Sequence, residues 1–223
     1  MTGGTGGLGS AVTRRFLDAS WRTIVPWYDE RELKRLDDHP LLDLIKADLF
    51  DPSSARACAE EAAADPRAPL TAVVNLVGGF AMGGRIHETP IEEFEEQLRL
   101  NLRPAYLTSQ AALPHLIAAG GGSIVCVSSR AALRPFSGAA GYVTSKGAVL
   151  SLVDCLAVEY RDDGVRANAV LPSVIDTPAN RAAQPDADHS RWVRPAQIAD
   201  VIYDLCAGAE VVSGAHIPVY GRA

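Results

Sequence analysis

Apolar, β-prone runs and helix-like stretches alternate along the whole chain. Because strand–helix–strand units cross over with a right hand, this order predicts an α/β fold. Its single sheet is parallel and doubly wound, flanked by helices, with a ligand crevice at the carboxyl ends of its strands. The expected strands are 23–28, 41–49, 70–77, 123–129, 165–172 and 214–220, and the expected helices are 10–20, 29–38, 51–65, 90–119, 138–162 and 195–208.

Size and composition suit one domain over residues 1–223, because the 223 residues are 48% hydrophobic. The formal net charge of −6 and the lack of a Lys/Arg run argue against a nucleic-acid or acidic-membrane partner. We expect neither a membrane span nor a signal peptide, and the cysteine usage described next is typical of a cytoplasmic protein. Four cysteines lie far apart without a CxxC motif and are expected to be reduced and mostly buried: Cys58, Cys126, Cys155 and Cys206.

The segment TGGTGGLG, residues 2–9, fits the pattern TGxxxGxG. Gly3 would allow a tight turn, Gly7 a close approach of the backbone to a pyrophosphate, and Gly9 close packing of the next helix on the sheet. The free N–H groups and positive dipole end of that helix would face the phosphates. A flexible glycine-rich tail is the alternative interpretation.

A dinucleotide-binding fold needs a strand directly before this loop, but only Met1 precedes Thr2. Such a strand is central in the sheet and buries about five apolar side chains, at roughly 1.5–3 kcal/mol each. Their loss is on the order of the whole stability of a domain. We therefore expect the first strand to be truncated, through a misplaced start codon or a shortened form; a sheet that closes differently is the alternative.

Tyr142 and Lys146 stand four residues apart in the helical segment that contains YVTSK, so they share one helix face. Ser129 follows the strand SIVCVSS, and strand ends are where this type of sheet gathers its active groups. A lysine cation about 4 Å away would lower the pKa of the tyrosine by about three units, to near 7. Tyr142 would then exchange a proton with a carbonyl or alcohol oxygen, while Ser129 hydrogen-bonds that oxygen.

From Thr2 to about Gly221 the chain resembles the short-chain dehydrogenase/reductase family. Besides the glycine loop, Ser129 and YVTSK, the segments that carry this resemblance are ADL (47–49), VNLVGG (74–79), LNL (100–102), LPSVIDT (171–177) and SGAHIPVYG (213–221). The resemblance implies a Rossmann-type fold that binds NAD or NADP, and a catalytic set of Asn101, Ser129, Tyr142 and Lys146. It also implies a homodimer or homotetramer, formed through the helices 90–119 and 138–162 and the last strand. The cofactor-binding residues that it implies are Gly3, Thr5, Gly7, Leu8, Gly9, Asp48, Leu49, Asn75, Gly78, Tyr142, Lys146, Pro172 and Thr177.

Asn101 also has a local argument, because Pro104 lies three residues further along the same helix. Proline cannot donate to the carbonyl of Leu100, so a kink is expected beside Asn101, with room for a water molecule. An ordinary amide on the helix surface is the alternative.

Cofactor choice depends on the end of the expected strand 23–28, which is the second strand when the truncated one is counted; there Asp29 and Arg31 follow Trp27. An acid at this place binds a ribose 2′-hydroxyl and an arginine accepts a 2′-phosphate, so the sequence favours NAD weakly. Asp29 is equally well explained as the N-cap of the segment 30–37.

Residues 176–193 are expected to cover the substrate, and they resemble the matching stretch of quinonoid dihydropteridine reductase, as LVGGFAMGG (76–84) does loosely. Possible substrate contacts there are Arg181, Arg191 and Trp192, with loop packing as the alternative. DADH (186–189) has metal-ligand residue types but no second cluster, so no metal is expected.

The sequence therefore predicts an NAD(P)-dependent oxidoreductase acting on a small carbonyl or secondary alcohol substrate, of the ketone or 3-oxoacyl kind. A dihydropteridine-reductase-like enzyme, a non-catalytic nucleotide-binding protein and an inactive truncated product are the alternatives.

Overall fold

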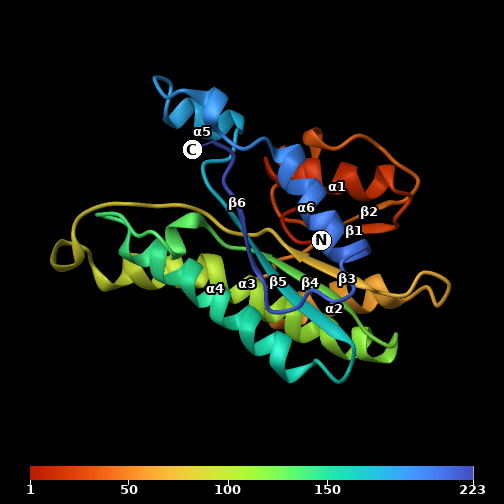
Figure 1. Cartoon of the computed structure of the whole chain (residues 1–223). Coiled ribbons are helices and arrows are strands. Elements are labelled where there is room, and N and C mark those ends of the chain that lie inside the picture. Colours follow the sequence, from red (N-terminus) through yellow and green to blue (C-terminus); the bar gives the residue numbers. More distant parts are fainter. Residues whose placement is uncertain (223) are drawn as a thin grey trace.

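The computed structural model describes residues 1–222. Six parallel strands form two groups, as Figure 1 shows. β1 (Thr23–Trp27) pairs with β2 (Leu42–Lys46), and β3 (Ala72–Asn75), β4 (Gly122–Val127), β5 (Val165–Pro172) and β6 (His216–Val219) pair in that order. The predicted α/β class with parallel strands flanked by helices is confirmed.

Helices cover both faces of the strands (Figure 1). α1 (Gly9–Asp18) and α6 (Pro195–Ala207) pack together on one face. On the other face α3 (Ile91–Ala118) packs between α2 (Pro52–Ala63) and α4 (Ala140–Glu159). The apolar composition of the inner strands follows from this arrangement, because a strand covered on both sides buries every side chain.

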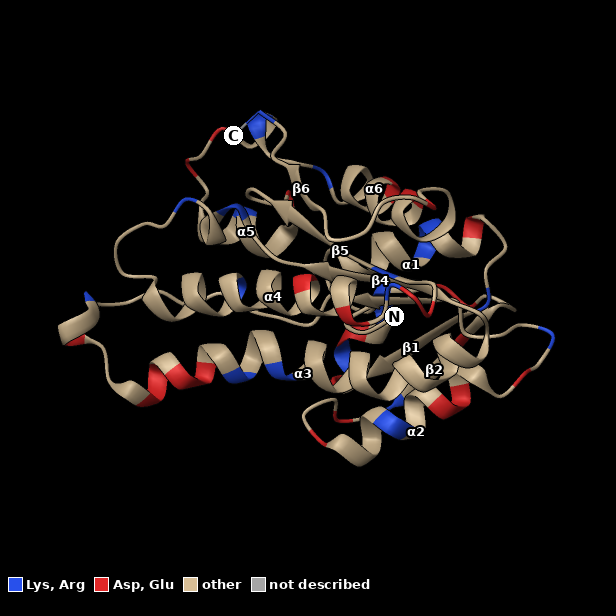
Figure 2. Cartoon of the chain, turned by 60° about the horizontal axis from the view of Figure 1, so that its bottom comes forward, with Lys and Arg blue, Asp and Glu red and all other residues tan. Residues whose placement is uncertain are grey.

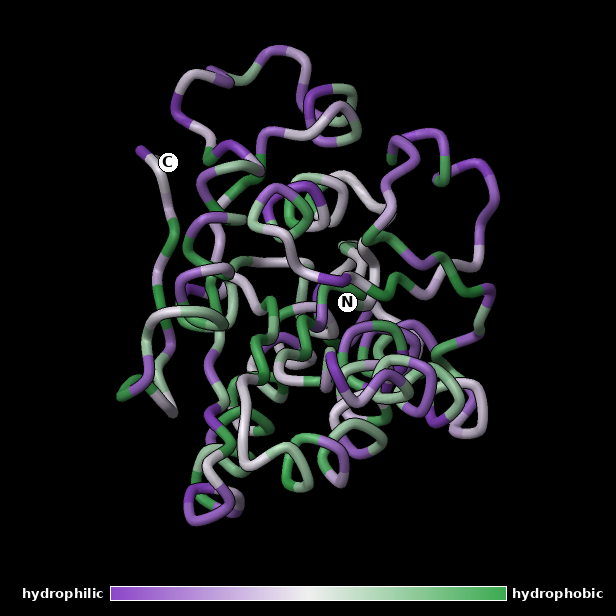
Figure 3. Tube along the Cα trace, turned by 90° about the vertical axis from the view of Figure 1, so that its right-hand side faces the viewer, coloured by the Kyte–Doolittle hydropathy of each residue, from purple (hydrophilic) through white to green (hydrophobic). Residues whose placement is uncertain are grey.

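Residues 1 and 2 lie between β1 and β3, where the two groups of strands meet. The α-amino nitrogen of Met1 donates to the carbonyl oxygen of Ile24 at 2.7 Å, and the N–H of Thr2 donates to Val74 at 2.9 Å. Figures 1 and 3 both place the N-terminus in the middle of the chain trace. The sheet therefore does not close in a different way: β1 and β3 stay apart, and only two residues stand between them.

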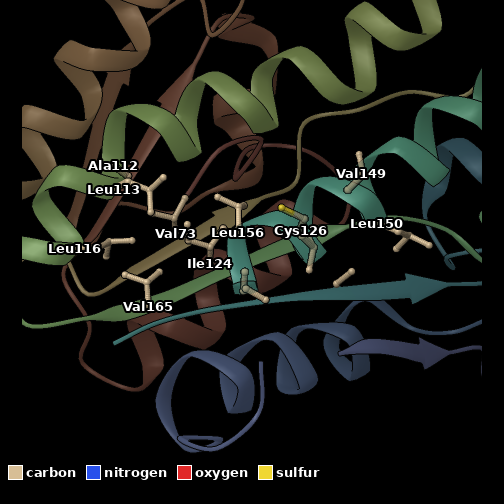
Figure 4. Packing of buried hydrophobic residues seen from close by; sticks show 14 of the residues in the cluster. Val73, Ala112, Leu113, Leu116, Ile124, Cys126, Val149, Leu150, Leu156 and Val165 are labelled. Carbon is tan, nitrogen blue, oxygen red and sulfur yellow. The ribbon is translucent and has the colours of Figure 1, made fainter. Parts of the chain in front are cut away.

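Two apolar clusters hold the helix layers against the strands. Figure 4 shows the first cluster, to which α3 contributes Leu116, β4 contributes Ile124 and α4 contributes Val149. The second lies on the α1/α6 face around Val12, Val125, Ile198 and Ile202. Burying an aliphatic side chain contributes about 1.5–3 kcal/mol, so these clusters fix the positions of the strand ends.

Cysteine burial agrees with the expectation of mostly buried thiols. Cys58, Cys126 and Cys206 are buried and Cys155 is exposed, and all four are free thiols. Burial raises the pKa of the Cys126 thiol to about 11 and that of Cys206 to about 12, so both stay neutral at physiological pH.

Local structure departs from the sequence prediction in two places. The expected helix 29–38 is only a 3₁₀ segment, Glu30–Arg35, which has no buried residue to hold a longer helix against the core. A short helix that the sequence analysis missed, α5 (Pro178–Ala183), begins with Thr177 as its N-cap. Pro178 at the first position favours this start, because proline costs nothing where no intrahelical donor is needed.

Helix α4 is long and apolar enough to cross a membrane by length and composition alone, an exception to the expectation of no candidate span. Its residues pack on α3 and β5. A core helix of this kind meets the same criteria, so its composition is weak evidence for a membrane.

Figure 2 shows acidic residues gathered on the first half of α3, where Glu92 and Glu93 suit the positive end of the helix dipole.

Candidate active site

Three of the four predicted catalytic residues come together at the carboxyl end of β4. Ser129 follows the strand and caps a short 3₁₀ segment, its Oγ accepting the N–H of Ala131 at 3.1 Å. Tyr142 and Lys146 stand one turn apart on α4, and the Lys146 Nζ lies 6.0 Å from the centre of the Tyr142 ring. The strand end and the helix face therefore converge as the spacing indicated.

Tyr142 differs from the prediction in its acidity. Burial raises the pKa of its phenol above the ordinary value, and a hydrogen bond with the Ser129 side chain opposes that rise only in part. The expected lowering to near 7 is wrong for this arrangement, because the loss of hydration outweighs the hydrogen bond with Ser129, and attraction by Lys146 is not among the causes that shift this pKa. Tyr142 is therefore a neutral phenol at physiological pH.

Lys146 is buried, and its Nζ donates to the carbonyl oxygen of Val127 at 3.0 Å. Burial lowers the pKa of Lys146 to about 8. This ammonium group is still mostly protonated at pH 7, but it holds its proton less tightly than a lysine in water. The sequence could not show this, because the spacing on a helix does not reveal how deeply a side chain is buried.

Asn101 lies on α3, buried and held at both ends of its amide. Its Oδ1 accepts the N–H of Gly79 at 3.0 Å, and its Nδ2 donates to the carbonyl of Gln97 at 3.1 Å. A Cβ atom on Gly78 would lie 2.6 Å from Asn101 Oδ1 and 3.0 Å from Lys146 Nζ. The loop after β3 thus passes between the amide and the ammonium group, and only glycine fits there. Pro104 lies inside α3 without ending the helix.

The glycine loop connects residue 2 to α1 by a tight turn. Gly3 has a φ of +65°, and a Cβ on Gly9 would lie 1.9 Å from the carbonyl oxygen of Gly3. Gly9 thus lets α1 pack against the start of the loop itself, rather than only against the sheet. A Cβ on Gly7 would approach Thr177 to 3.2 Å, so the loop faces the segment after β5.

This loop has the features that a dinucleotide phosphate needs. Leu8 precedes α1 without a side-chain cap, and within residues 1–222 the N–H groups of Gly7 and Leu8 have no acceptor. Open N–H groups at the start of a helix bind anions, so the residues present fit a dinucleotide.

The remaining predicted cofactor residues divide into two kinds. Asp48, Pro172 and Thr177 lie at or beyond strand ends, and Thr177 caps α5. Asn75 and Leu49 are buried. The Asn75 amide donates to Ser109 at 3.1 Å and to the Cys126 sulfur at 3.6 Å, so Asn75 holds β3, β4 and α3 together.

Comparisons with known proteins decide the family. The family model described as short chain dehydrogenase matches residues 1–188. A 2-(R)-hydroxypropyl-CoM dehydrogenase of Xanthobacter autotrophicus is 33% identical over 99% of this chain and 96% of its own length. The chain belongs to the short-chain dehydrogenase/reductase family.

Solved structures agree with this assignment. A putative NAD(P)-dependent gluconate 5-dehydrogenase from Beutenbergia cavernae with bound NADP has a TM-score of 0.85 and 26% identity, over 99% of this chain and 93% of that one. ElxO with NADP bound has a TM-score of 0.90 over 99% of this chain and 95% of that one, and at 23% identity it shows the fold alone. This short-chain dehydrogenase/reductase is thus an oxidoreductase with a Rossmann-type nucleotide-binding fold, and these two structural neighbours contain bound NADP.

The residues expected to choose the cofactor in this short-chain dehydrogenase/reductase are paired with each other. The guanidinium of Arg31 donates to both carboxylate oxygens of Asp29, with Nη2 at 2.7 Å from Oδ2. These hydrogen bonds lower the pKa of Asp29 to about 2. Asp29 also accepts the N–H of Arg31 as the cap of Glu30–Arg35. The pair cancels its own charge, so this place gives no preference for NAD over NADP.

Thr5 carries a contact that the sequence did not reveal. Its buried hydroxyl donates to Glu32 Oε2 at 2.8 Å, and Arg35 bonds both Glu32 and the carbonyl of Thr5. This network ties the glycine loop of the dehydrogenase to the 3₁₀ segment after β1, and a sequence separation of 27 residues left no signal of it.

The segment 176–193 makes contacts mainly with itself. Arg181 forms a two-point ion pair with Asp176, and Arg191 donates to the carbonyl of Arg222 at 2.9 Å. Trp192 is buried with its ring 4.4 Å from that of His189. These contacts agree with the alternative of loop packing. Within residues 1–222 no group of three or more His, Cys, Asp or Glu side chains could hold a metal ion.

An aromatic wall beside Tyr142 was missed by the sequence analysis. Phe80 stands edge-on to the Tyr142 ring at 4.9 Å between centres, and Phe136 lies 6.3 Å from Phe80. Both are about half exposed, at 57% and 47%. Phe80 ends the run VGGF after β3, so an aromatic residue directly after the glycines was the available signal.

Proposed function

We propose that this chain is an NAD(P)-dependent oxidoreductase that transfers a hydride between nicotinamide and a carbonyl or secondary alcohol. The observation that carries the proposal is the meeting of Ser129, Tyr142, Lys146 and Asn101 beside the glycine loop. The relative from Xanthobacter autotrophicus is named as acting on a 2-hydroxypropyl group, a secondary alcohol, which supports this substrate class.

Tyr142 is the acid of the reaction in the direction of reduction. The glycine loop would hold NAD(P)H, which when bound would supply the hydride to the substrate carbon. The carbonyl oxygen becomes a strong base as it gains charge, and the neutral phenol of Tyr142 donates its proton to that oxygen. A pKa raised by burial suits this role, because it keeps the phenol protonated until the oxygen becomes basic.

Ser129 orients the substrate oxygen. Its hydroxyl lies within hydrogen-bond reach of the Tyr142 side chain, so both groups address one oxygen from two sides. A hydrogen bond that strengthens as charge develops lowers the barrier rather than only improving binding.

Lys146 and Asn101 restore the proton of Tyr142. The lowered pKa of Lys146, about 8, makes its ammonium a ready proton donor once the phenol has been deprotonated. Asn101 is fixed next to Lys146 by its bonds to Gly79 and Gln97, so it is a positioning residue on the path from Lys146 to solvent.

The aromatic wall gives the substrate an apolar side. Phe80 and Phe136 present ring faces to solvent beside Tyr142, and exposed aromatic rings there would lose unfavourable contact with water when an apolar group packs on them. A ketone with an aromatic or aliphatic substituent fits this surface better than a small charged carbonyl.

The outer face of α3 and α4 is proposed to pair with a second copy of the chain. Tyr106 is 50% exposed in a groove there, whose lining combines apolar side chains with two arginines: Phe50, Leu98, Leu102, Tyr106, Ala148 and Leu152, with Arg99 and Arg103. Val158, at the end of α4, is 68% exposed. Tyr106→Glu should give a monomer by light scattering where the parent chain gives a dimer or tetramer; a parent chain that is monomeric would contradict this pairing.

The function is tested with purified chain, NADH and NADPH, and a panel of ketones, aldehydes and 3-oxoacyl thioesters. We expect oxidation of at least one reduced cofactor with a ketone, and binding of that cofactor by calorimetry. Cofactor binding without turnover on any member of the panel would favour a nucleotide-binding protein instead.

A further inference from the structure

Tyr220, Gly221 and Arg222 follow β6 and connect two parts of the candidate site that are far apart in the sequence. We call these three residues the C-terminal clasp. β6 leads the chain toward the side of the molecule on which α5 lies (Figure 1). The clasp contacts the end of the segment 176–193 through Arg222 and Gly221, and the residue after Ser129 through Tyr220.

The segment 176–193 begins and ends at one narrow neck. The N–H of Val193 donates to the carbonyl of Val174 at 3.1 Å, and the N–H of Asp176 donates to the carbonyl of Val193 at 2.8 Å. Ile175 and Val193 form a parallel bridge, and Val193 is buried. The chain between these residues therefore leaves the body of the protein and returns to it at a single place.

Between the two sides of this neck the chain has few contacts that hold it in place. α5 (Pro178–Ala183) and the 3₁₀ segment His189–Arg191 contain no buried residue. In the part of the chain that the structure describes, Arg222 is the one hydrogen-bond partner of residues 178–191 that lies outside 174–193. Segments with few buried contacts open at a small free-energy cost, so the neck and the clasp decide where residues 178–191 lie.

Arg222 and Gly221 hold the second side of the neck. The N–H of Arg222 donates to the carbonyl of Arg191 at 3.0 Å, and the Nε and Nη2 atoms of Arg191 donate to the carbonyl of Arg222 at 3.1 and 2.9 Å. Gly221 has a φ of +62°, and a Cβ there would lie 3.1 Å from the carbonyl oxygen of Arg191 and 3.3 Å from the nitrogen of Val193. The clasp thus turns in a left-handed conformation, which favours glycine, directly against the backbone of the neck.

Tyr220 contacts the other part of the site. The hydroxyl of Ser173 donates to the carbonyl of Tyr220 at 2.6 Å, and the guanidinium of Arg130 lies 5.6 Å from the centre of the Tyr220 ring. A cation within about 6 Å of an aromatic ring is attracted to the face of that ring. Arg130 directly follows Ser129 and begins the short 3₁₀ segment that Ser129 caps. The clasp therefore joins the element that carries Ser129 to the neck of the segment 176–193.

We propose that the C-terminal clasp is a positioning element, which holds residues 178–191 closed over the substrate and in a fixed position relative to Ser129. This inference rests on the proposed function. Arg222 acts through Arg191, so it is a positioning residue and not a catalytic one. Opening of the segment would speed the release of substrate, whereas Tyr142, which α4 positions, would keep its geometry. The clasp thus controls KM rather than kcat.

Arg191→Met tests the clasp, because it removes both side-chain hydrogen bonds to Arg222 and keeps an unbranched side chain. Its matched control is Arg181→Met, which makes the same change in the same segment but breaks only the ion pair with Asp176. Hydrogen exchange at the amides of residues 179–190 should become about tenfold faster in Arg191→Met and change by less than about twofold in the control.

Kinetics separate positioning from a loss of folded protein. In ketone reduction Arg191→Met should raise KM by about tenfold and keep kcat within about twofold, since less folded protein would lower kcat and leave KM unchanged. Arg191→Lys, whose ammonium group can donate to the same carbonyl, should recover part of the affinity. Gly221→Ala, which is strained by its positive φ, should repeat the effect on KM from the other side of the contact.

Hydrogen exchange needs no turnover, so a chain that reduces nothing on the panel would count against the proposed function while exchange still decides whether the clasp holds the segment. Unchanged exchange at residues 179–190 in Arg191→Met would overturn the proposal, as would an equal acceleration in Arg181→Met. A rise of KM in Arg191→Met that Gly221→Ala does not share would show that Arg191 itself touches the substrate, and would also overturn it.

Discussion

The strands on the two sides of the glycine loop differ in how completely their polar groups are paired, while on the β3–β6 side Gln97 Oε1 and Thr108 Oγ1 of helix α3 are buried without a partner within residues 1–222. On the β3–β6 side Asn168 uses both ends of its amide, with Val212 at 2.8 Å and Ala215 at 3.0 Å, and Ser123 donates to Leu205 at 3.0 Å. On the β1 side the buried Met1 amino group has one acceptor, the carbonyl of Ile24, and the Nη1 atom of Arg22 is buried without a partner among the described residues.

This difference indicates which side of the molecule is held in place by its own hydrogen bonds. The proposed catalytic residues lie on the paired side, where packing fixes them before any ligand arrives, as preorganised groups require. The glycine loop joins the two sides, so its geometry depends on how firmly residues 1 and 2 are held.

The largest effect is expected at Gly9, where the loop meets α1. In Gly9→Ala the new methyl group would lie 1.9 Å from the Gly3 carbonyl oxygen, so the loop must open. We expect a loss of at least about 3 kcal/mol in the free energy of unfolding, measured by urea denaturation.

Gly147→Ala is the matched control for that change. Gly147 lies within α4 and an added Cβ meets nothing within 4 Å, so alanine should stabilise the helix by up to about 1 kcal/mol. Similar losses of unfolding free energy in both variants would contradict the claim that the close contact of Gly9 with Gly3 sets the glycine loop apart from the open position of Gly147 in α4.

Stability should depend on pH through the Met1 amino group. Its pKa falls from 8.0 in the unfolded chain to about 6 in the fold, so the unfolded state binds more protons between these values. Stability should therefore rise with pH by about 2.7 kcal/mol over the whole titration, most of it between pH 6 and 8. Well below pH 6 this group no longer makes stability depend on pH, but the full cost of burying its charge remains.

Acetylating the N-terminus isolates the titration of the Met1 amino group, because the histidines and all other ionisable groups are unchanged. The facing thiols, Cys58 and Cys206, have raised pKa values and remain neutral over this range. Urea midpoints that change equally with pH in acetylated and unmodified chains would show that the amino group is not buried.

Replacing Lys146 should separate stability from activity on the paired side. Lys146→Met removes a buried charge whose pKa is lowered from 10.5 to about 8, and loses the bond to Val127. We expect a net gain of about 2 kcal/mol at pH 7, together with the loss of turnover. A large fall in the thermal midpoint would show that the ammonium group is well stabilised in its site.

Phe80→Ala should have the smallest effect, confined to the substrate. Phe80 is exposed and stands against Tyr142, so its loss should raise KM for a ketone with an aromatic substituent by about tenfold and leave a small aliphatic ketone unchanged. Leu133→Ala, another exposed apolar change, is the control. Equal KM changes for both ketones would argue against the aromatic wall as a substrate surface.

The sequence predicted the parallel sheet and most elements, because runs such as IVCV, residues 124–127, are apolar without interruption and are typical of strands buried on both faces. It also placed Ser129, Tyr142 and Lys146 together, because strand ends and helix faces follow from spacing. It was wrong about the acidity of Tyr142 and silent on the Thr5–Glu32 contact and Phe80. These depend on burial and on contacts between distant segments, which no local pattern encodes.

Turnover of Tyr142→Phe tests the account most directly. The variant keeps the ring against Phe80 and loses only the hydroxyl. The control is Tyr203→Phe, which makes the same change on another helix, at a ring that packs on Phe16. We predict that kcat for ketone reduction falls by about 10²–10⁴-fold in Tyr142→Phe and is unchanged in the control, with cofactor affinity kept in both. A Tyr142→Phe enzyme that retains most of its turnover would contradict the assignment of the proton donor.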